Sequence, residues 1–268
     1  MSAPRQVTLF VVAAQFLTRL PTPRVADFEP QWLRRSLRYF PLVGGVVGLA
    51  NVAVWWIAIQ WLPATVAVGL MLAASLLLTG AFHEDGFADA CDGFGGGTTA
   101  ARTLEIMKDS RIGAFGAMGI FMMLGLKWAA IVDLPAYTLP LLIVGAHVVS
   151  RWCALGLVWR LRYARADEGA KSLPFEAGLS GPEWLLAALL GAVLVAIVAS
   201  ITGLGRLEAR ALVAGVVAAA ILAAGCAAYF RARIGGYTGD CLGATQQLAE
   251  LAYLVVALAV LRSQAHTA

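Results

Sequence analysis

The chain has 268 residues, of which 60% are hydrophobic and 13% charged, and its mean hydropathy is +0.78. A soluble domain averages about a quarter charged residues, so these side chains could not cover the surface of a soluble domain of this size. A soluble enzyme, a secreted disulfide scaffold and a disordered chain are therefore excluded, and a polytopic membrane protein remains. The net charge of +4 indicates no nucleic-acid partner. The four cysteines form no CxxC pair, so we expect neither a zinc site nor a disulfide framework.

The first apolar stretch, residues 7–20, has about 14 residues and is short for a membrane crossing. It predicts an interfacial or re-entrant helix that stops at Pro21 and Pro23. Seven longer stretches follow, each long enough to cross the bilayer as a helix. They cover residues 40–62, 64–82, 112–132, 134–160, 184–204, 209–230 and 243–262. We expect one all-α membrane domain over residues 1–268, a bundle of about seven transmembrane helices plus the short N-terminal helix.

The basic residues are distributed unevenly between the two ends of this predicted bundle. Of the 20 Lys and Arg residues, 15 fall before the first span or in the second, fourth and sixth loops, and only Arg206, Arg210 and Arg262 lie on the other side. The positive-inside rule then places the N-terminus and these loops in the cytoplasm, and the C-terminus outside.

An acidic segment lies in the second loop. Six of the 16 acidic residues fall between Ala81 and Arg111. Asp85, Asp89 and Asp92 are spaced i, i+4, i+7, so a helix would place them within about 60° of one face. Such carboxylates repel one another unless a cation lies between them, and hard oxygen ligands suit Mg²⁺. We therefore predict that these three aspartates bind Mg²⁺; the alternatives are a solvated acidic loop and a zinc site through His83, which lacks a second ligand at the right spacing.

Glycines and basic residues follow the three aspartates. The glycines provide a flexible backbone whose N–H groups could contact phosphate oxygens, although a simple hinge would also use glycine. Two basic side chains three residues apart on a predicted helix would add positive charge on one face. Residues 83–111 are therefore predicted to form a cytoplasmic active-site loop for a phosphate-bearing substrate. The predicted phosphate-binding residues are Gly93, Gly95, Gly96, Gly97, Lys108 and Arg111.

A second group of polar residues lies just before and within the last span. Asp240 begins a predicted helix at the same membrane face as the acidic loop, where it could be a catalytic residue or an N-cap. Glu250 lies inside the span, where an ionised carboxylate is costly and normally has a function. Arg151 and His147 are predicted to face the bundle interior, with Glu250 as one candidate partner for Arg151.

Several of these runs resemble the cobalamin synthase family, the adenosylcobinamide-GDP ribazoletransferases. The two long central runs are residues 83–97, HEDGFADACDGFGGG, and residues 104–116, LEIMKDSRIGAFG. Shorter runs at residues 15–21, 38–45 and 236–244 are similar to the same family, so the resemblance covers almost the whole chain. Glu84 and Tyr237 depart from residues that are common at these positions in the family.

The resemblance implies a Mg²⁺-dependent, multi-pass enzyme of the bacterial inner membrane with cytoplasmic active-site loops. It would catalyse the last assembly step of adenosylcobalamin: α-ribazole, or its 5′-phosphate, attacks the phosphate on the cobinamide side chain, and GMP leaves. In that mechanism Asp85, Asp89 and Asp92 would hold Mg²⁺, while Asp89 or Asp240 could instead accept the proton of the attacking hydroxyl. Lys108 and Arg111 would stabilise charge on the transferred phosphoryl group. The oligomeric state stays open.

Two rival functions use the same residues. A CDP-alcohol phosphatidyltransferase also places aspartates beside Asp-Gly in a membrane bundle, but its pattern needs Ala-Arg where this chain has Ala88 and Asp89. A cation transporter could use the three aspartates as a vestibule, but it would need ionisable groups along several spans. Only Lys127, His147, Arg151 and Glu250 qualify.

Overall fold

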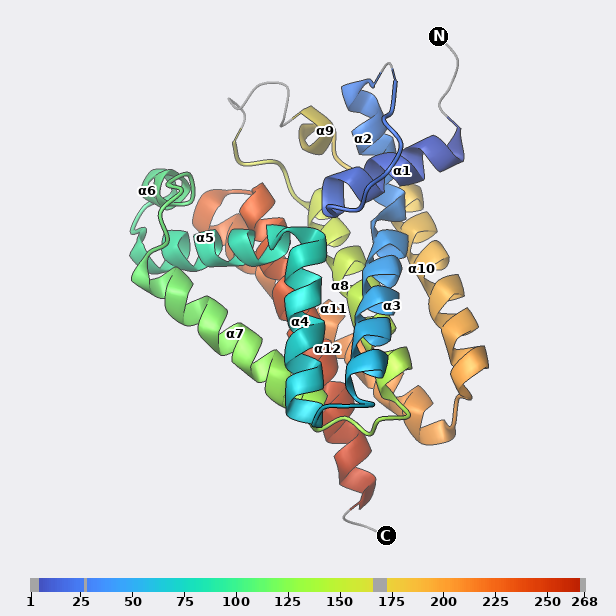
Figure 1. The fold of residues 1–268 in the computed structure, drawn as a ribbon. Helices are drawn as coiled ribbons and strands as arrows, with labels where there is room; N and C mark the ends of the chain where they lie inside the picture. Colours follow the sequence, from blue (N-terminus) through green and yellow to red (C-terminus); the bar gives the residue numbers. More distant parts are fainter. Residues whose placement is uncertain (1–4, 27, 166–172, 266–268) are drawn as a thin grey trace.

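The computed structural model describes residues 5–26, 28–165 and 173–265, and these are folded mainly as α-helices (Figure 1). The all-α prediction is therefore confirmed. In chain order the helices are α1 (Gln6–Leu17), α2 (Pro30–Ser36), the 3-10 helix η1 (Leu37–Tyr39), α3 (Phe40–Ala58), α4 (Ala64–Thr79), α5 (Phe82–Gly96), α6 (Ala100–Ile106), α7 (Ala114–Val132), α8 (Leu139–Arg160), α9 (Leu173–Glu176), α10 (Gly181–Thr202), α11 (Arg206–Ile234) and α12 (Gly239–Ala265).

Six helical stretches in the described part of the chain are long and apolar enough to cross a membrane. They are the continuous stretch that ends with α3, and α7, α8, α10, α11 and α12. The remaining predicted span, residues 64–82, corresponds to α4, which has only 16 residues and meets α5 at an angle of 90°. Counting this bent pair as one span gives the seven that the sequence predicted.

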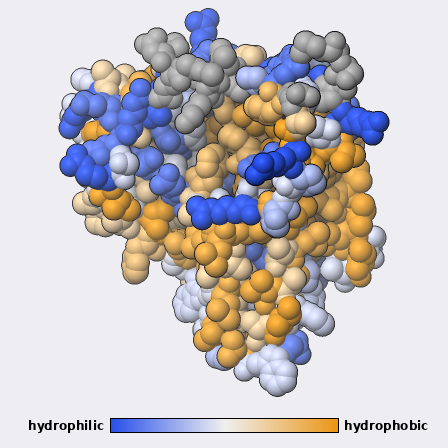
Figure 2. All heavy atoms as spheres, turned by 45° about the horizontal axis from the view of Figure 1, so that its top comes forward, coloured by the Kyte–Doolittle hydropathy of each residue, from blue (hydrophilic) through white to orange (hydrophobic). Residues whose placement is uncertain are grey.

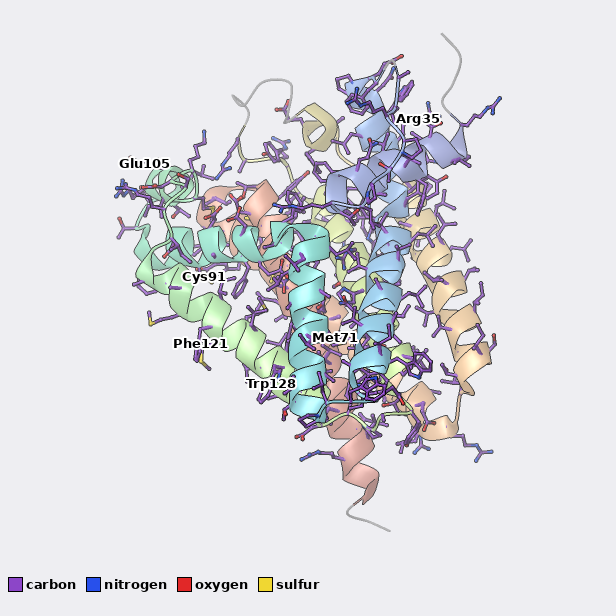
Figure 3. All side chains as sticks on the ribbon, in the orientation of Figure 1. Arg35, Met71, Cys91, Glu105, Phe121 and Trp128 are labelled. Carbon is purple, nitrogen blue, oxygen red and sulfur yellow. The ribbon has the colours of Figure 1, made fainter. Side chains whose placement is uncertain are left out.

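Helix α8 occupies the centre of the bundle. In the most apolar 18-residue stretch of α8, 83% of the residues are buried, compared with 28% in the corresponding stretches of α7, α10 and α11. The outer helices expose large apolar side chains such as Phe121 of α7 (Figure 3), as expected for a surface that faces lipid. Polar side chains on α8 must therefore find their partners inside the protein.

The short N-terminal helix is also confirmed. α1 lies across the end of the bundle, on the same side as α5 (Figure 1). It ends at Leu17, earlier than the prolines suggested, because the next residue, Thr18, leaves the helical conformation and its hydroxyl donates a hydrogen bond to the carbonyl oxygen of Ala14 (2.7 Å). α12 ends at the opposite end of the bundle from α1 (Figure 1), in agreement with the predicted odd number of crossings.

The segment predicted as an active-site loop is largely helical, so that part of the prediction was wrong. After α4 the chain turns at Gly80 and Ala81, which both adopt the left-handed conformation (φ 66° and 56°), and continues into α5. α5 lies across the upper ends of the other helices, at an angle of 90° to α4 (Figure 1). Eight of its residues are buried, which explains why a segment rich in Asp and Gly stays helical.

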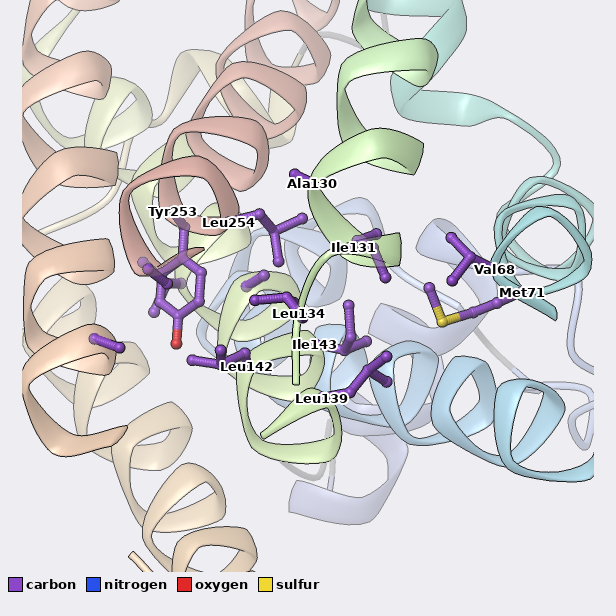
Figure 4. Close-up of a cluster of buried hydrophobic side chains, with 14 of the residues drawn as sticks. Val68, Met71, Ala130, Ile131, Leu134, Leu139, Leu142, Ile143, Tyr253 and Leu254 are labelled. Carbon is purple, nitrogen blue, oxygen red and sulfur yellow. The ribbon is translucent and has the colours of Figure 1, made fainter. Parts of the chain in front are cut away.

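Polar and apolar side chains are separated along the bundle. Figure 2 shows hydrophilic side chains gathered over the end that carries α5 and α6, with an apolar surface below them. At the other end the interior is filled by an apolar cluster that includes Met71, Ile131, Leu142 and Tyr253 (Figure 4). The candidate site therefore lies at the polar end of an otherwise apolar protein.

Candidate active site

The acidic helix α5 crosses the start of α12 with almost no space between the two backbones. A Cβ atom added to Gly243 would lie 2.8 Å from the carbonyl oxygen of His83, and one added to Gly86 would lie 3.1 Å from Cα of Asp240. Only glycine permits this approach. The crossing brings the aspartates of α5 next to Asp240, and it confirms that these two segments, about 150 residues apart, meet at one end of the bundle.

Asp89 lies at the centre of this acidic group. Partial burial, followed by the neighbouring carboxylates of Asp240 and Asp85, raises the pKa of its carboxyl group to about 7, against the opposing charge of Arg165. A carboxyl group with this pKa changes its charge near neutral pH. Such crowding of like charges at the mouth of a bundle is typical of a functional site.

Asp240 is held by two contacts. Nη2 of Arg165 lies 2.9 Å from its Oδ2, with both side chains largely buried, and the hydroxyl of Thr238 donates to the same oxygen at 3.2 Å. Sequence reasoning did not single out Arg165. A buried aspartate needs a basic partner. The predicted cytoplasmic loops contain many Lys and Arg residues, and the sequence does not indicate which of them pairs with Asp240.

Asp92 has a different environment from Asp85 and Asp89. Its carboxylate oxygens accept hydrogen bonds from the backbone N–H groups of Gly113 and Gly116 at 2.7 and 2.8 Å, so it caps the N-terminus of α7. This capping accounts for its burial without a metal ion. The proposed role of Asp92 as a Mg²⁺ ligand stays a prediction, now with a structural alternative.

The glycine run is not a flexible loop. Gly93, Gly95 and Gly96 form the last turns of α5, and the N–H of Gly97 bonds to the carbonyl oxygen of Gly93 at 2.9 Å. A Cβ atom on Gly93 would lie 2.5 Å from the side chain of Met107, and one on Gly95 would lie 2.6 Å from Phe115. Close packing therefore explains the glycines, and their role in binding phosphate stays untested.

Lys108 and Arg111 do not share a helical face, because α6 ends at Ile106 and both residues lie in the turn before α7. The helix predicted for them was wrong. The guanidinium of Arg111 is in solvent, with its side chain 86% exposed, and it pairs with Asp109 at 2.6 Å. This pairing lowers the pKa of Asp109 to about 2. Lys108 is exposed in the same turn.

The donors near Asp89 suit Mg²⁺ in kind, since carboxylate oxygens are its usual protein ligands. In the described part of the chain, no three His, Cys, Asp or Glu side chains are close enough together to hold one metal ion. Mg²⁺ commonly uses only one or two carboxylates together with substrate phosphate and water, so Asp85 and Asp89 could suffice. The crowding of Asp89 is what a bound divalent cation would relieve.

A buried polar cluster lies beneath α5, inside the bundle. Lys127 of α7 pairs with Glu250 of α12 at 2.7 Å and also bonds to Gln247. The amide of Gln247 in turn donates to Glu84 of α5 at 2.9 Å. A chain of polar contacts thus connects the acidic helix to the membrane interior.

His147 and Arg151 join this cluster from α8. Nδ1 of His147 lies 3.3 Å from Glu250, and Arg151 donates a hydrogen bond to the carbonyl oxygen of His147 at 3.0 Å. The interior position predicted for both is confirmed. The direct partner of Glu250 is Lys127 rather than Arg151, which the sequence left open.

Comparisons with known proteins bear on the whole chain. The family model of the cobalamin-5-phosphate synthases matches residues 9–258. A protein of Leptothrix cholodnii named adenosylcobinamide-GDP ribazoletransferase is 45% identical over 250 residues, which cover 92% of this chain and 93% of the relative. Proteins of the same name from Shewanella sp. (strain ANA-3) and Shewanella oneidensis are each 41% identical over 260 residues, covering 96% of this chain and 95% of each relative. No solved structure matches the chain.

Proposed function

The chain belongs to the cobalamin-5-phosphate synthase family, and we propose that it joins adenosylcobinamide-GDP to α-ribazole, or to α-ribazole 5′-phosphate, with release of GMP. The observation that carries this proposal is the match itself, which runs through both halves of the candidate site, from the aspartates of α5 to Asp240. The product is adenosylcobalamin or its 5′-phosphate, so the reaction is the last assembly step of this cofactor.

The chemistry is a displacement at phosphorus. A free secondary hydroxyl oxygen of the ribose bonds to the phosphorus that carries the cobinamide side chain, the pyrophosphate bond breaks, and GMP leaves with the electron pair. The 5′-oxygen takes no part, because in the 5′-phosphate substrate it carries a phosphate that the product retains. Asp240, oriented by Arg165 and Thr238, accepts the proton of the attacking hydroxyl. Positioning and electrostatic stabilisation supply most of the rate enhancement in phosphoryl transfer.

Asp85 and Asp89 are the residues best placed to hold Mg²⁺. Asp85 is exposed at the end of the bundle, and Asp89 lies one helical turn further along α5, beside Asp240. When bound, Mg²⁺ would neutralise charge on the pyrophosphate and on the departing GMP. Asp92 and the glycine run support α5 and α7 at the edge of this site.

The direct test uses purified protein supplied with adenosylcobinamide-GDP and α-ribazole. We expect GMP to form only when both substrates and Mg²⁺ are present. The rival phosphatidyltransferase reaction predicts release of CMP from a CDP-alcohol instead. The absence of GMP from an intact, folded preparation would contradict the proposed function.

The Arg111→Lys variant tests whether Arg111 contacts phosphate. Its pair with Asp109 lies in solvent, where ion pairs contribute little to stability, so the Arg111 side chain can exchange it for a phosphoryl oxygen. Lysine keeps the charge but cannot make the bidentate contact of a guanidinium. We expect turnover to fall at least about tenfold, with unchanged thermal stability. Full activity, measured as GMP release, would mean that Arg111 only forms its surface ion pair with Asp109. Arg165 would then be the candidate for the phosphate contact.

We further propose that the polar end of the bundle faces the cytoplasm across the bacterial inner membrane. Gly96 and Gly239 are both exposed there. In intact cells, cysteines placed by Gly96→Cys and Gly239→Cys should resist a membrane-impermeant thiol reagent, because the reagent reaches only the outer face. Leu204→Cys, 48% exposed at the opposite end, should react and is the control. Labelling at Gly96 or Gly239 would contradict the orientation.

A further inference from the structure

A cavity lined by aromatic rings opens beside the carboxylates. It has a volume of about 110 Å³ and lies between α1, α3, α5, α8, α9 and α12. Gly239 and Gly243 form one wall, so the cavity borders both Asp240 and the crossing of α5 with α12. Tyr163 lies on another side, two residues before the Arg165 that holds Asp240.

The aromatic rings form a connected set around Phe16 of α1. Its ring centre lies 5.7 Å from that of Phe40 in a stacked arrangement, 5.4 Å from Phe82 edge to face, and 5.8 Å from Phe175. Tyr163 stacks on Phe175 at 6.5 Å. Rings at these distances create a surface suited to the face and edges of another flat ring. An enclosed apolar cavity that binds benzene measures roughly 150 Å³, so this one of about 110 Å³ admits only part of a flat aromatic base, whose remainder would lie at its mouth.

Polar groups in the lining are few. Among its described residues, only His83, Arg151 and Tyr163 carry polar side-chain atoms. Arg151 is 98% buried, and its Nε–H has no hydrogen-bond partner, although the same side chain donates from Nη1 to His147. A buried donor without a partner is costly, so a ligand acceptor at this point would stabilise the site.

We propose that this cavity binds the base of α-ribazole and so sets which nucleoside attacks; the inference rests on the proposed function. The base, 5,6-dimethylbenzimidazole, is a flat apolar bicyclic ring with one free acceptor nitrogen once the other ring nitrogen carries the ribose. Its acceptor nitrogen suits the unpaired Nε–H of Arg151, and its apolar ring suits the aromatic lining. Guanine carries several donors and acceptors around its edge, which this lining would leave unpaired. With the base in the cavity, the ribose would lie at the Gly239 wall, on the side of Asp240.

The first experiment measures binding to the purified full-length protein by isothermal titration calorimetry, without adenosylcobinamide-GDP. The wild type should bind α-ribazole about tenfold more tightly than the matching indole riboside, in which a C–H replaces the acceptor nitrogen. Guanosine should not displace α-ribazole. Equal affinity for the indole riboside, or displacement by guanosine, would overturn the assignment without any variant having to fold.

The second experiment removes the central ring. Phe16→Ala should weaken α-ribazole binding about tenfold and raise its KM, while the KM for adenosylcobinamide-GDP stays unchanged. Phe121→Ala, which removes a phenyl ring 76% exposed on α7, is the matched control and should change neither value. Unchanged α-ribazole affinity in Phe16→Ala, or a rise only in the KM for adenosylcobinamide-GDP, would reject the cavity as the base site.

Failure of the cavity and failure of the proposed function give different results. If the wild type releases GMP but its α-ribazole affinity does not depend on Phe16, the function survives and the cavity assignment falls. If α-ribazole binds in the Phe16-dependent way but no GMP forms, the cavity assignment survives and the proposed reaction falls.

Discussion

Replacing Asp89 with asparagine is expected to lower GMP release by a factor on the order of 10² or more. The substitution keeps the shape of the side chain but removes the negative charge that would attract a divalent cation and orient the phosphates. Glu105→Gln is the matched control, because Glu105 is an exposed carboxylate on α6 that pairs with Arg102 at the surface. Activity close to that of the wild type, with the same Mg²⁺ requirement, would remove Asp89 from the site.

The same variant should gain stability while it loses activity. Because the folded state raises the pKa of Asp89 to about 7, the ionised carboxylate is disfavoured on folding, and the free energy of unfolding falls as pH rises from about 4 through 7. Without metal, Asp89→Asn should therefore raise the Tm relative to the wild type more at pH 8 than at pH 5. Added Mg²⁺ should raise the Tm of the wild type more than that of the variant. An equal Tm difference at both pH values would contradict this electrostatic account.

Adding a single methyl group at Gly243 is expected to have the second-largest effect. The Cβ atom of Gly243→Ala would lie 2.8 Å from a backbone carbonyl oxygen of α5, so the two helices must separate. A displacement of about 1 Å between reacting groups can cost about 10² in rate, and we expect a loss of that size together with a lower Tm.

The control for this variant is Gly225→Ala on α11, where an added Cβ atom meets nothing within 4 Å. It should leave turnover unchanged and should not lower the Tm, because alanine favours a helix more than glycine does. Gly86→Ala approaches the crossing from the other side, 3.1 Å from Cα of Asp240, and should resemble Gly243→Ala. If Gly243→Ala were fully active, the close crossing would have no part in catalysis.

The membrane spans could be predicted from the sequence because lipid demands long apolar helices, and the positions of α3, α7, α8, α10, α11 and α12 follow their hydropathy closely. The helical state of residues 82–96 could not. Four of these 15 residues are glycine, which disfavours a helix by local propensity. Packing against α12 and α7 overrides that preference, and such long-range contacts leave no periodic signal in the segment itself.

The candidate site, too, could be predicted from the sequence only in part. Asp85 and Asp89 lie one turn apart on α5, as their spacing predicted for the case that this segment is helical, and charge asymmetry correctly grouped them with Asp240. The spacing also placed Asp92 on the same face, but its carboxylate bonds to the N-terminus of α7, a tertiary contact. Arg165 escaped notice because its partner is far away in the sequence, and the turn that follows α6 separates Lys108 from Arg111.

The pairing of Lys127 with Glu250 has a consequence for how the protein is made. Lys127 lies on α7 and Glu250 on α12, so the ribosome delivers the ammonium group to the membrane three long helices, α8, α10 and α11, before its counter-ion. An unpaired lysine near the centre of a membrane helix costs about 2.5–3.5 kcal/mol on insertion scales. The nascent bundle is therefore poorly stabilised until the final helix arrives, and that helix also brings Asp240. Insertion of the last helix therefore completes both the membrane core and the active site, and a chain cut short before residue 239 has neither.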